Sequence, residues 1–206
     1  MFYEPKKGHS LPHNPFNALV FPRPIGWISS LSKKGIANLA PYSFFNAVAY
    51  EPPQLMFAAT DYHSNGGLKD SIANILDTKE FVVNLATKKL QQSVVHSSID
   101  APHGVDEFKL MKLKKRKSTM VQPPSVAESP ATLECKLIRK IDLKAKKNNQ
   151  NIMIIGEVIG IHIKDAFITK GKVNSLAMRA ISRMGYTEYS EVKSRFLMDR
   201  PEYPRK

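Results

Sequence analysis

The sequence predicts a mainly β protein, an antiparallel barrel with a few peripheral helices. About six segments are rich in β-branched and aromatic residues, whereas only two or three short stretches have helical spacing. This ratio favours one antiparallel barrel over a sheet that alternates with helices. The 206 residues, 42% of them hydrophobic, suffice for one packed core. We expect a single domain over residues 1–206, with its core at about 19–189 and extensions at 1–18 and 190–206.

The first two strands are predicted to form a hairpin. Two prolines early in the run 19–32 force an extended backbone and an edge or entry position. Gly35 supplies the turn into a second extended run, 36–50. Two further prolines close that run, and a third strand follows at 54–60.

Helices and strands alternate briefly in the next part of the chain. Residues 69–78 predict a short helix that Asp70 or Ser71 caps. A β-branched, aromatic strand follows at 80–86, and residues 87–99 are expected to be helical. The residues of this second helix that are expected to face inward are Leu90, Val94 and Val95.

The last part of the chain begins with a long excursion from the barrel. Residues 100–130 are rich in Pro, Ser and Lys, and strands resume after them, so the excursion is not a linker between domains. Two strands around a polar tip are predicted at 131–143 and 152–163. A short strand at 167–169 and a weak helix at 175–184 complete the prediction.

Composition narrows the function classes. The 31 Lys and Arg against 18 Asp and Glu give a net charge of +13, which attracts phosphates, nucleotides, nucleic acid or acidic membrane. The single cysteine, Cys135, excludes an intramolecular disulfide and a cysteine-rich zinc site, and its apolar flanks predict a small core residue. No segment has the pattern of a secretory signal or of a membrane helix, so we expect a cytoplasmic protein without a membrane partner.

Several common site motifs are missing from the sequence. It contains neither a P-loop, nor a glycine-rich dinucleotide fingerprint, nor a zinc-protease or nucleophile-elbow motif. The six histidines show no paired ligand spacing, and His63 near Asp61 is interpreted as a solvated loop residue, so no metal is expected. The basic run Lys109–Lys117 has no aromatic stacking platform, which favours a solvated amphipathic face over a nucleic-acid site.

Two groups of polar residues on neighbouring predicted strands are candidates for binding a ligand. Ser29 and Ser30 end one strand, and Asn38 with the segment 40–43 lies on the next, where hydroxyl and amide groups can bind the polar edge of a heterocycle. The tripeptide Lys69-Asp70-Ser71 begins a helix, where free N–H groups and a lysine suit a phosphate. We therefore expect the hydroxyls of Ser30 and Ser43, together with Lys69, to face one ligand.

The motifs occur in one order along the chain, from residue 22 onward: PRPIGWISSLSKKGIANLAPYSFFNAV, EPPQLMF, LKDSIANI, EFVVNLA, PHGVDEF, VAESPATLECKL and IIGEVIGIHI. Together they resemble the flavin reductase-like family, whose members bind FMN on an antiparallel, Greek-key split β-barrel. The resemblance covers about residues 19–189. It implies a homodimer with one FMN per subunit near the subunit interface, and NADH or NADPH as co-substrate.

The resemblance also implies a cofactor site made of four groups of residues. The strand against the isoalloxazine ring contributes Trp27, Ser29 and Ser30. The segment along the ribityl chain contributes Asn38, Ala40, Pro41, Tyr42 and Ser43. The helix start that meets the phosphate contributes Lys69, Asp70 and Ser71, where serine replaces the threonine of the family's Lys-Asp-Thr pattern. A C-terminal Arg–Gly–aromatic element that reaches the cofactor contributes Arg183.

The resulting functional hypothesis is an NAD(P)H-dependent flavin oxidoreductase. Hydride would pass from the nicotinamide to the flavin, so the chemistry belongs to the cofactor and no catalytic side chain is predicted. One alternative is an FMN-binding electron-transfer protein without nicotinamide turnover. A second is a basic nucleic-acid-binding barrel, whose binding would weaken steeply with salt. The residues leave open FMN or FAD, NADH or NADPH, and the final electron acceptor.

Overall fold

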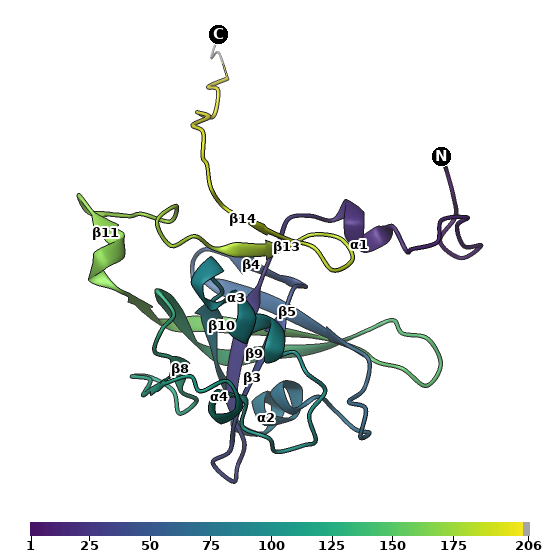
Figure 1. Cartoon of the computed structure of the whole chain (residues 1–206), viewed down its shortest axis with the longest axis horizontal. Coiled ribbons are helices and arrows are strands. Elements are labelled where there is room, and N and C mark those ends of the chain that lie inside the picture. Colours follow the sequence, from purple (N-terminus) through teal and green to yellow (C-terminus); the bar gives the residue numbers. More distant parts are fainter. Residues whose placement is uncertain (204–206) are drawn as a thin grey trace.

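The computed structural model describes residues 1–203, and a seven-stranded antiparallel sheet forms its centre (Figure 1). The strand order is β3-β2-β6-β9-β10-β5-β4. The hairpin of β9 and β10 is the longest element, and its tip projects beyond the rest of the sheet in Figure 1. The strands of this sheet are β2 (Gly26–Leu31), β3 (Ala37–Tyr42), β4 (Phe45–Ala49), β5 (Gln54–Thr60), β6 (Glu80–Leu85), β9 (Ala131–Leu143) and β10 (Asn151–Ile163).

Three smaller sheets and several short helices surround the central sheet. The small sheets contain β1 (Arg23–Pro24), β13 (Ile181–Arg183) and β14 (Tyr189–Glu191); β7 (Lys115–Arg116) and β8 (Ser125–Val126); β11 (Ile168–Thr169) and β12 (Lys172–Val173). The helices are α1 (Phe16–Leu19), α2 (Asp70–Thr78), α3 (Gln91–His96) and α4 (Glu107–Leu110), with 3₁₀ turns η1 (Lys88–Leu90) and η2 (Asp165–Phe167). Within residues 1–203, none of these helices has the length and apolar character needed to cross a membrane.

The core forms two clusters because successive residues of a strand face opposite sides of the sheet. Ile28 joins a cluster with Phe57 and Phe81, over which α2 packs, whereas its neighbour Trp27 joins a second cluster with Phe108. The predicted mainly β, antiparallel class is therefore confirmed.

Cys135 lies in the first of these clusters and has no exposed surface. Burial raises the pKa of its thiol, so the side chain stays a neutral, unreactive group at ordinary pH. The prediction that Cys135 is a small core residue is confirmed.

The structure corrects several predicted elements. The run 36–50 is not one strand, because the chain leaves the sheet at Ser43 and Phe44 between β3 and β4. The helix predicted at 175–184 is wrong: residues 181–183 form β13, which pairs with β1 and β14. Pairing between distant segments outweighs weak local helix propensity there. Val95, expected to face inward, is 40% exposed, whereas Val94 is buried.

In the rest of the chain, the predicted types of element are mostly right, but their first and last residues differ from those observed. The run 19–32 divides into the end of α1, the short β1 and β2, while the predicted strand 54–60 matches β5. In the basic run, α4 ends at Leu110, and Lys112 takes a left-handed conformation with φ of 53°. Residues 204–206, the end of the predicted C-terminal extension, lie outside the described residues.

Candidate functional site

A cavity of about 340 Å³ opens where β3 meets the N-terminus of α2. We call it the polar pocket. It gathers seven of the residues predicted to hold a cofactor, which β3 and the start of α2 supply: Asn38, Ala40, Pro41, Tyr42, Lys69, Asp70 and Ser71. The opposite side comes from two loops and α4, namely Tyr62, His63, Ser97, Ser98, Ile99, Asp100, Ala101 and Glu107.

A buried hydrogen-bond network ties the walls of the polar pocket together. The Ser71 hydroxyl donates to Asn38 Oδ1 at 2.6 Å, and Asn38 Nδ2 donates to Glu107 Oε2 at 3.0 Å. The backbone N–H of Leu39 donates to the same carboxylate oxygen at 2.9 Å. Burial raises the pKa of Glu107, while these donors act in the opposite direction. The network holds β3 against both α2 and α4.

Tyr42 links this network to the core. Its ring packs on Phe57 with the ring centroids 4.8 Å apart. Burial raises the pKa of Tyr42 to about 12, while the neighbouring Ser71 side chain acts in the opposite direction. The phenol is therefore neutral at ordinary pH, so it adds a polar group but no charge to the pocket.

The start of α2 has no side-chain cap among the described residues. Lys69 occupies the N-cap position, and the predicted caps are wrong because both side chains bind other elements. Ser71 donates to Asn38, whereas Asp70 accepts from the backbone N–H of Gly104 at 2.9 Å and also contacts His103. The first turn of α2 thus keeps the positive end of its dipole next to Lys69.

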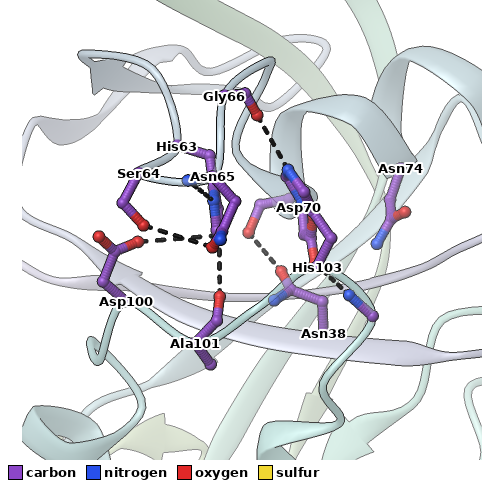
Figure 2. A network of polar contacts seen from close by, with 12 residues as sticks. Asn38, His63, Ser64, Asn65, Gly66, Asp70, Asn74, Asp100, Ala101 and His103 are labelled. Carbon is purple, nitrogen blue, oxygen red and sulfur yellow. Dashed lines mark hydrogen bonds and ion pairs between the residues drawn. The ribbon is translucent and has the colours of Figure 1, made fainter.

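Two stacked histidines lie among the loops next to the pocket, and one of them, His63, lines it (Figure 2). The rings of His63 and His103 lie 3.9 Å apart between centroids and 29° from parallel. His63 Nε2 faces the Ala101 carbonyl at 2.9 Å, while the Asn65 N–H donates to His63 Nδ1 at 3.0 Å. His63 therefore joins the loop that contains Asn65 to the segment that contains Ala101.

His103 has the complementary pattern, because both of its ring nitrogens face acceptors (Figure 2). Nδ1 contacts Asp70 Oδ1, and Nε2 lies 2.9 Å from the Gly66 carbonyl. The hydrogen bond to Asp70, together with that to Gly66, raises the pKa of His103. His103 therefore connects the start of α2 with the loop that contains Gly66.

His63 is a lining residue of the polar pocket that the sequence interpretation missed. It was interpreted as a solvated loop residue, yet its side chain is 9% exposed and lines the polar pocket. No local pattern identifies it, because its partners Ala101 and His103 follow about forty positions later.

Trp27 lies behind the pocket wall rather than on it. The side chain has no exposed surface, and its indole N–H donates to Ser97 Oγ at 2.8 Å. Ser97 itself lines the pocket. Trp27 thus holds the segment that follows α3 in place through Ser97, and it does not itself line the pocket.

Ser29 and Ser30 do not form the expected hydroxyl pair, because adjacent residues of a strand point to opposite faces. Ser29 Oγ donates to the Pro124 carbonyl at 2.6 Å, on one side of the sheet. Ser30 Oγ accepts from Asn74 Nδ2 of α2 at 3.1 Å, on the other side. Neither side chain has exposed surface, so both are engaged within the protein.

The two remaining predicted residues, Ser43 and Arg183, line a different cavity of about 450 Å³. We call it the arginine pocket. It is lined by Pro12, His13, Asn14, Asn17, Arg23, Ser43, Phe44, Arg183 and Tyr186.

The register of β2 and β3 also places Ser30 far from Ser43. Ser30 pairs with Asn38, whereas Tyr42, next to Ser43, pairs with Gly26 at the far end of the ladder. Four residues of strand span roughly 13 Å at about 3.3 Å per residue. Ser30 is buried against Asn74, and Ser43 lines a different cavity from Lys69, so the expectation that Ser30, Ser43 and Lys69 face one ligand is wrong.

Comparison with known proteins identifies the family. Residues 18–176 match the flavin reductase like domain. The chain belongs to the flavin reductase like family. An uncharacterized protein of Aquifex aeolicus is 38% identical over 172 residues, which is 83% of this chain and 85% of that protein.

Solved structures of the flavin reductase like family share the fold. Nitrilotriacetate monooxygenase component B from Bacillus cereus has a TM-score of 0.83 at 27% identity, covering 93% of this chain and all of that one (100%). A putative flavin reductase with a split barrel domain from Shewanella frigidimarina has a TM-score of 0.75 at 18% identity, covering 91% and 89% of the two chains. The predicted flavin reductase-like split barrel is confirmed.

Proposed function

We propose that this chain binds FMN in the polar pocket and catalyses NAD(P)H-dependent reduction of flavin. One observation carries the proposal: in a flavin reductase like protein, β3 and the lysine-flanked start of α2 line the same cavity. Lys69 and the first-turn N–H groups of α2 would hold the phosphate. The segment Ala40–Tyr42 would lie along the rest of the cofactor.

The residues of the polar pocket fit such a ligand. Ala40 and Pro41 have small side chains that allow a flat ring to approach the backbone. Neutral Tyr42 offers a polar group, and Lys69 supplies a positive charge. The carboxylate of Asp70 would repel a phosphate, but it is engaged by His103 and by the Gly104 N–H.

FMN, when bound, would supply the capacity to accept and donate hydride. The work of the chain is then to bind and orient the rings. The Ser71–Asn38 hydrogen bond fixes the spacing between α2 and β3, and Glu107 fixes Leu39 of the same strand. Hydride transfer needs no proton from a side chain, which is consistent with the absence of a predicted acid–base residue.

We further propose that the protein acts as a homodimer with the flavin near the subunit interface. Large apolar side chains of the C-terminal segment support this proposal: Phe196, Leu197 and Met198 are 82%, 92% and 83% exposed. Contiguous exposed apolar groups usually mark a contact surface. A second copy of the chain is the partner that the family resemblance implies.

The decisive experiment is a visible absorption spectrum of the purified full-length protein with added FMN, after gel filtration. We expect flavin absorption to stay with the protein and to be bleached anaerobically by NADH or NADPH. Lys69→Ala should weaken FMN binding about tenfold, the usual scale for a lost charge-assisted contact. Lys34→Ala, which removes an exposed lysine from the β2–β3 turn, is the matched control.

The outcomes separate the competing functions. A protein that retains no flavin, and that gains no thermal stability from FMN, contradicts the proposal. Bound FMN that neither nicotinamide bleaches, but that a small redox protein reduces, supports the electron-transfer alternative. The nucleic-acid alternative requires salt-sensitive binding of oligonucleotides by the flavin-free protein.

A further inference from the structure

Arg23 and Arg183 are directly opposed in the antiparallel pair of β1 and β13. Cβ atoms in such positions lie about 4.5–5.5 Å apart, and like charges placed there destabilise the pair. Both side chains line the arginine pocket. Burial, followed by the charge of Arg183, lowers the pKa of Arg23. The fold thus concentrates two positive charges at one cavity.

No carboxylate among the described residues forms an ion pair with Arg23 or Arg183. Arg23 is only 7% exposed, and its terminal nitrogens donate to backbone carbonyls, including that of Met184 at 3.0 Å. Its Nε is buried without a hydrogen-bond partner in the described part of the chain. Arg183 donates to the Tyr189 hydroxyl at 2.6 Å. A buried charge without a counter-charge is costly, so an anion would stabilise this arrangement.

The remaining lining of the pocket indicates the chemistry of the ligand. Phe44 and Tyr186 present aromatic surface, and Ser43 adds a hydroxyl. Guanidinium groups bind carboxylate and phosphate oxygens in preference to other anions because their fork of donors matches two oxygens at once. The pocket therefore offers guanidinium donors for an oxyanion and, at about 450 Å³, room for the rings of an organic molecule.

We propose that the arginine pocket binds a small organic anion, with its carboxylate or phosphate oxygens held by the Arg23–Arg183 pair. The oxyanion has two possible sources: the carboxylate of an aromatic acid, or the phosphates of a dinucleotide. This site is additional to the polar pocket, and its existence does not depend on the proposed FMN site.

The test uses the full-length protein saturated with FMN. Benzoate and inorganic pyrophosphate are titrated separately, with affinity measured by calorimetry and by the shift in melting temperature. We expect one of them to bind, and Arg183→Gln to weaken that binding about tenfold or more. Arg195→Gln, which removes the same charge from the exposed C-terminal segment, should bind as the wild type does. Binding of benzoate assigns the site to an aromatic acid, and binding of pyrophosphate assigns it to a dinucleotide.

Four results would overturn the inference, three from the binding data and one from the melting temperature. The first is that neither anion binds, and the second is that Arg183→Gln and Arg195→Gln bind equally. The third is that FMN and the anion compete, which would make the pocket part of the flavin site. The melting temperature without anion is a check on folding: Arg183→Gln removes the like charge beside Arg23 but also the hydrogen bonds to Tyr189 and Tyr186, so this variant should melt close to the wild-type temperature. A large fall would show that Arg183 is a structural residue and would count against the site.

Discussion

The polar pocket, which Asn38 and residues 40–42 of β3 help to line, and the arginine pocket, which the next residues Ser43 and Phe44 help to line, balance their charges in opposite ways. In the polar pocket, Glu107 accepts from Asn38 and Leu39, and Asp70 is engaged by His103. In the arginine pocket, the two guanidinium groups contact neutral oxygens and aromatic rings, and neither forms an ion pair with a carboxylate of the described residues. In the polar pocket, the protein itself supplies partners for the carboxylates of Glu107 and Asp70. In the arginine pocket, the proposed anionic ligand supplies the counter-charge for the two arginines. Variants should therefore damage stability at the polar pocket and ligand binding at the arginine pocket.

The sharpest test of this contrast is Glu107→Ala. The substitution leaves the Asn38 amide and the Leu39 N–H buried without an acceptor, at about 1–3 kcal/mol for each. We expect the free energy of unfolding to fall by about 2–4 kcal/mol in urea titrations. Glu107→Gln keeps an acceptor oxygen and should lose much less. A Glu107→Ala protein within about 0.5 kcal/mol of the wild type would show that the network is not a source of stability.

A smaller effect is expected at Ser71, which joins α2 to β3. Ser71→Ala removes the 2.6 Å hydrogen bond to Asn38, so stability should fall by about 1–2 kcal/mol, together with FMN affinity. Ser71→Thr retains the hydroxyl and is the matched control. Thermal unfolding and flavin titration measure the two quantities. Equal behaviour of the alanine and threonine variants would exclude a role for the hydroxyl.

The smallest effect is a pH dependence at the loop side of the polar pocket. His103 faces Asp70, the Gly66 carbonyl and the ring of His63, with Asp100 nearby, and its pKa is raised in the folded protein. A raised pKa stabilises the closed loops fully below the ordinary value of 6.5, and this stabilisation is lost as the pH rises through the folded value. Hydrogen exchange at residues 63–67 and 101–104 should therefore accelerate, relative to the core, from below pH 6.5 to above the folded pKa.

His103→Gln provides the control for this prediction, because glutamine cannot take up a proton. Its loop exchange should show no pH step beyond the intrinsic chemistry of exchange. A step that persists in this variant would show that His103 is not the source of the pH dependence.

The sequence predicted much of the polar pocket because its informative signals are local. The small residues at 40 and 41 and the Lys69-Asp70-Ser71 tripeptide at a helix start are short patterns, and the structure brings them to one cavity. Capping was predicted wrongly, since the partners of Asp70 and Ser71 lie thirty-three or thirty-four positions away. His63 was missed for the same reason.

The sequence by itself determined the antiparallel β class, the position of β5, the buried state of Cys135 and the residues at the start of α2. These follow from hydrophobic alternation, turn residues and helix ends, which act over a few positions. Only the tertiary structure decided that Ser29 and Ser30 turn apart, that Ser43 leaves the polar pocket, and that Arg183 meets Arg23. The reason is physical: register between strands far apart in the chain is selected by burial of the whole core, and no local propensity encodes it.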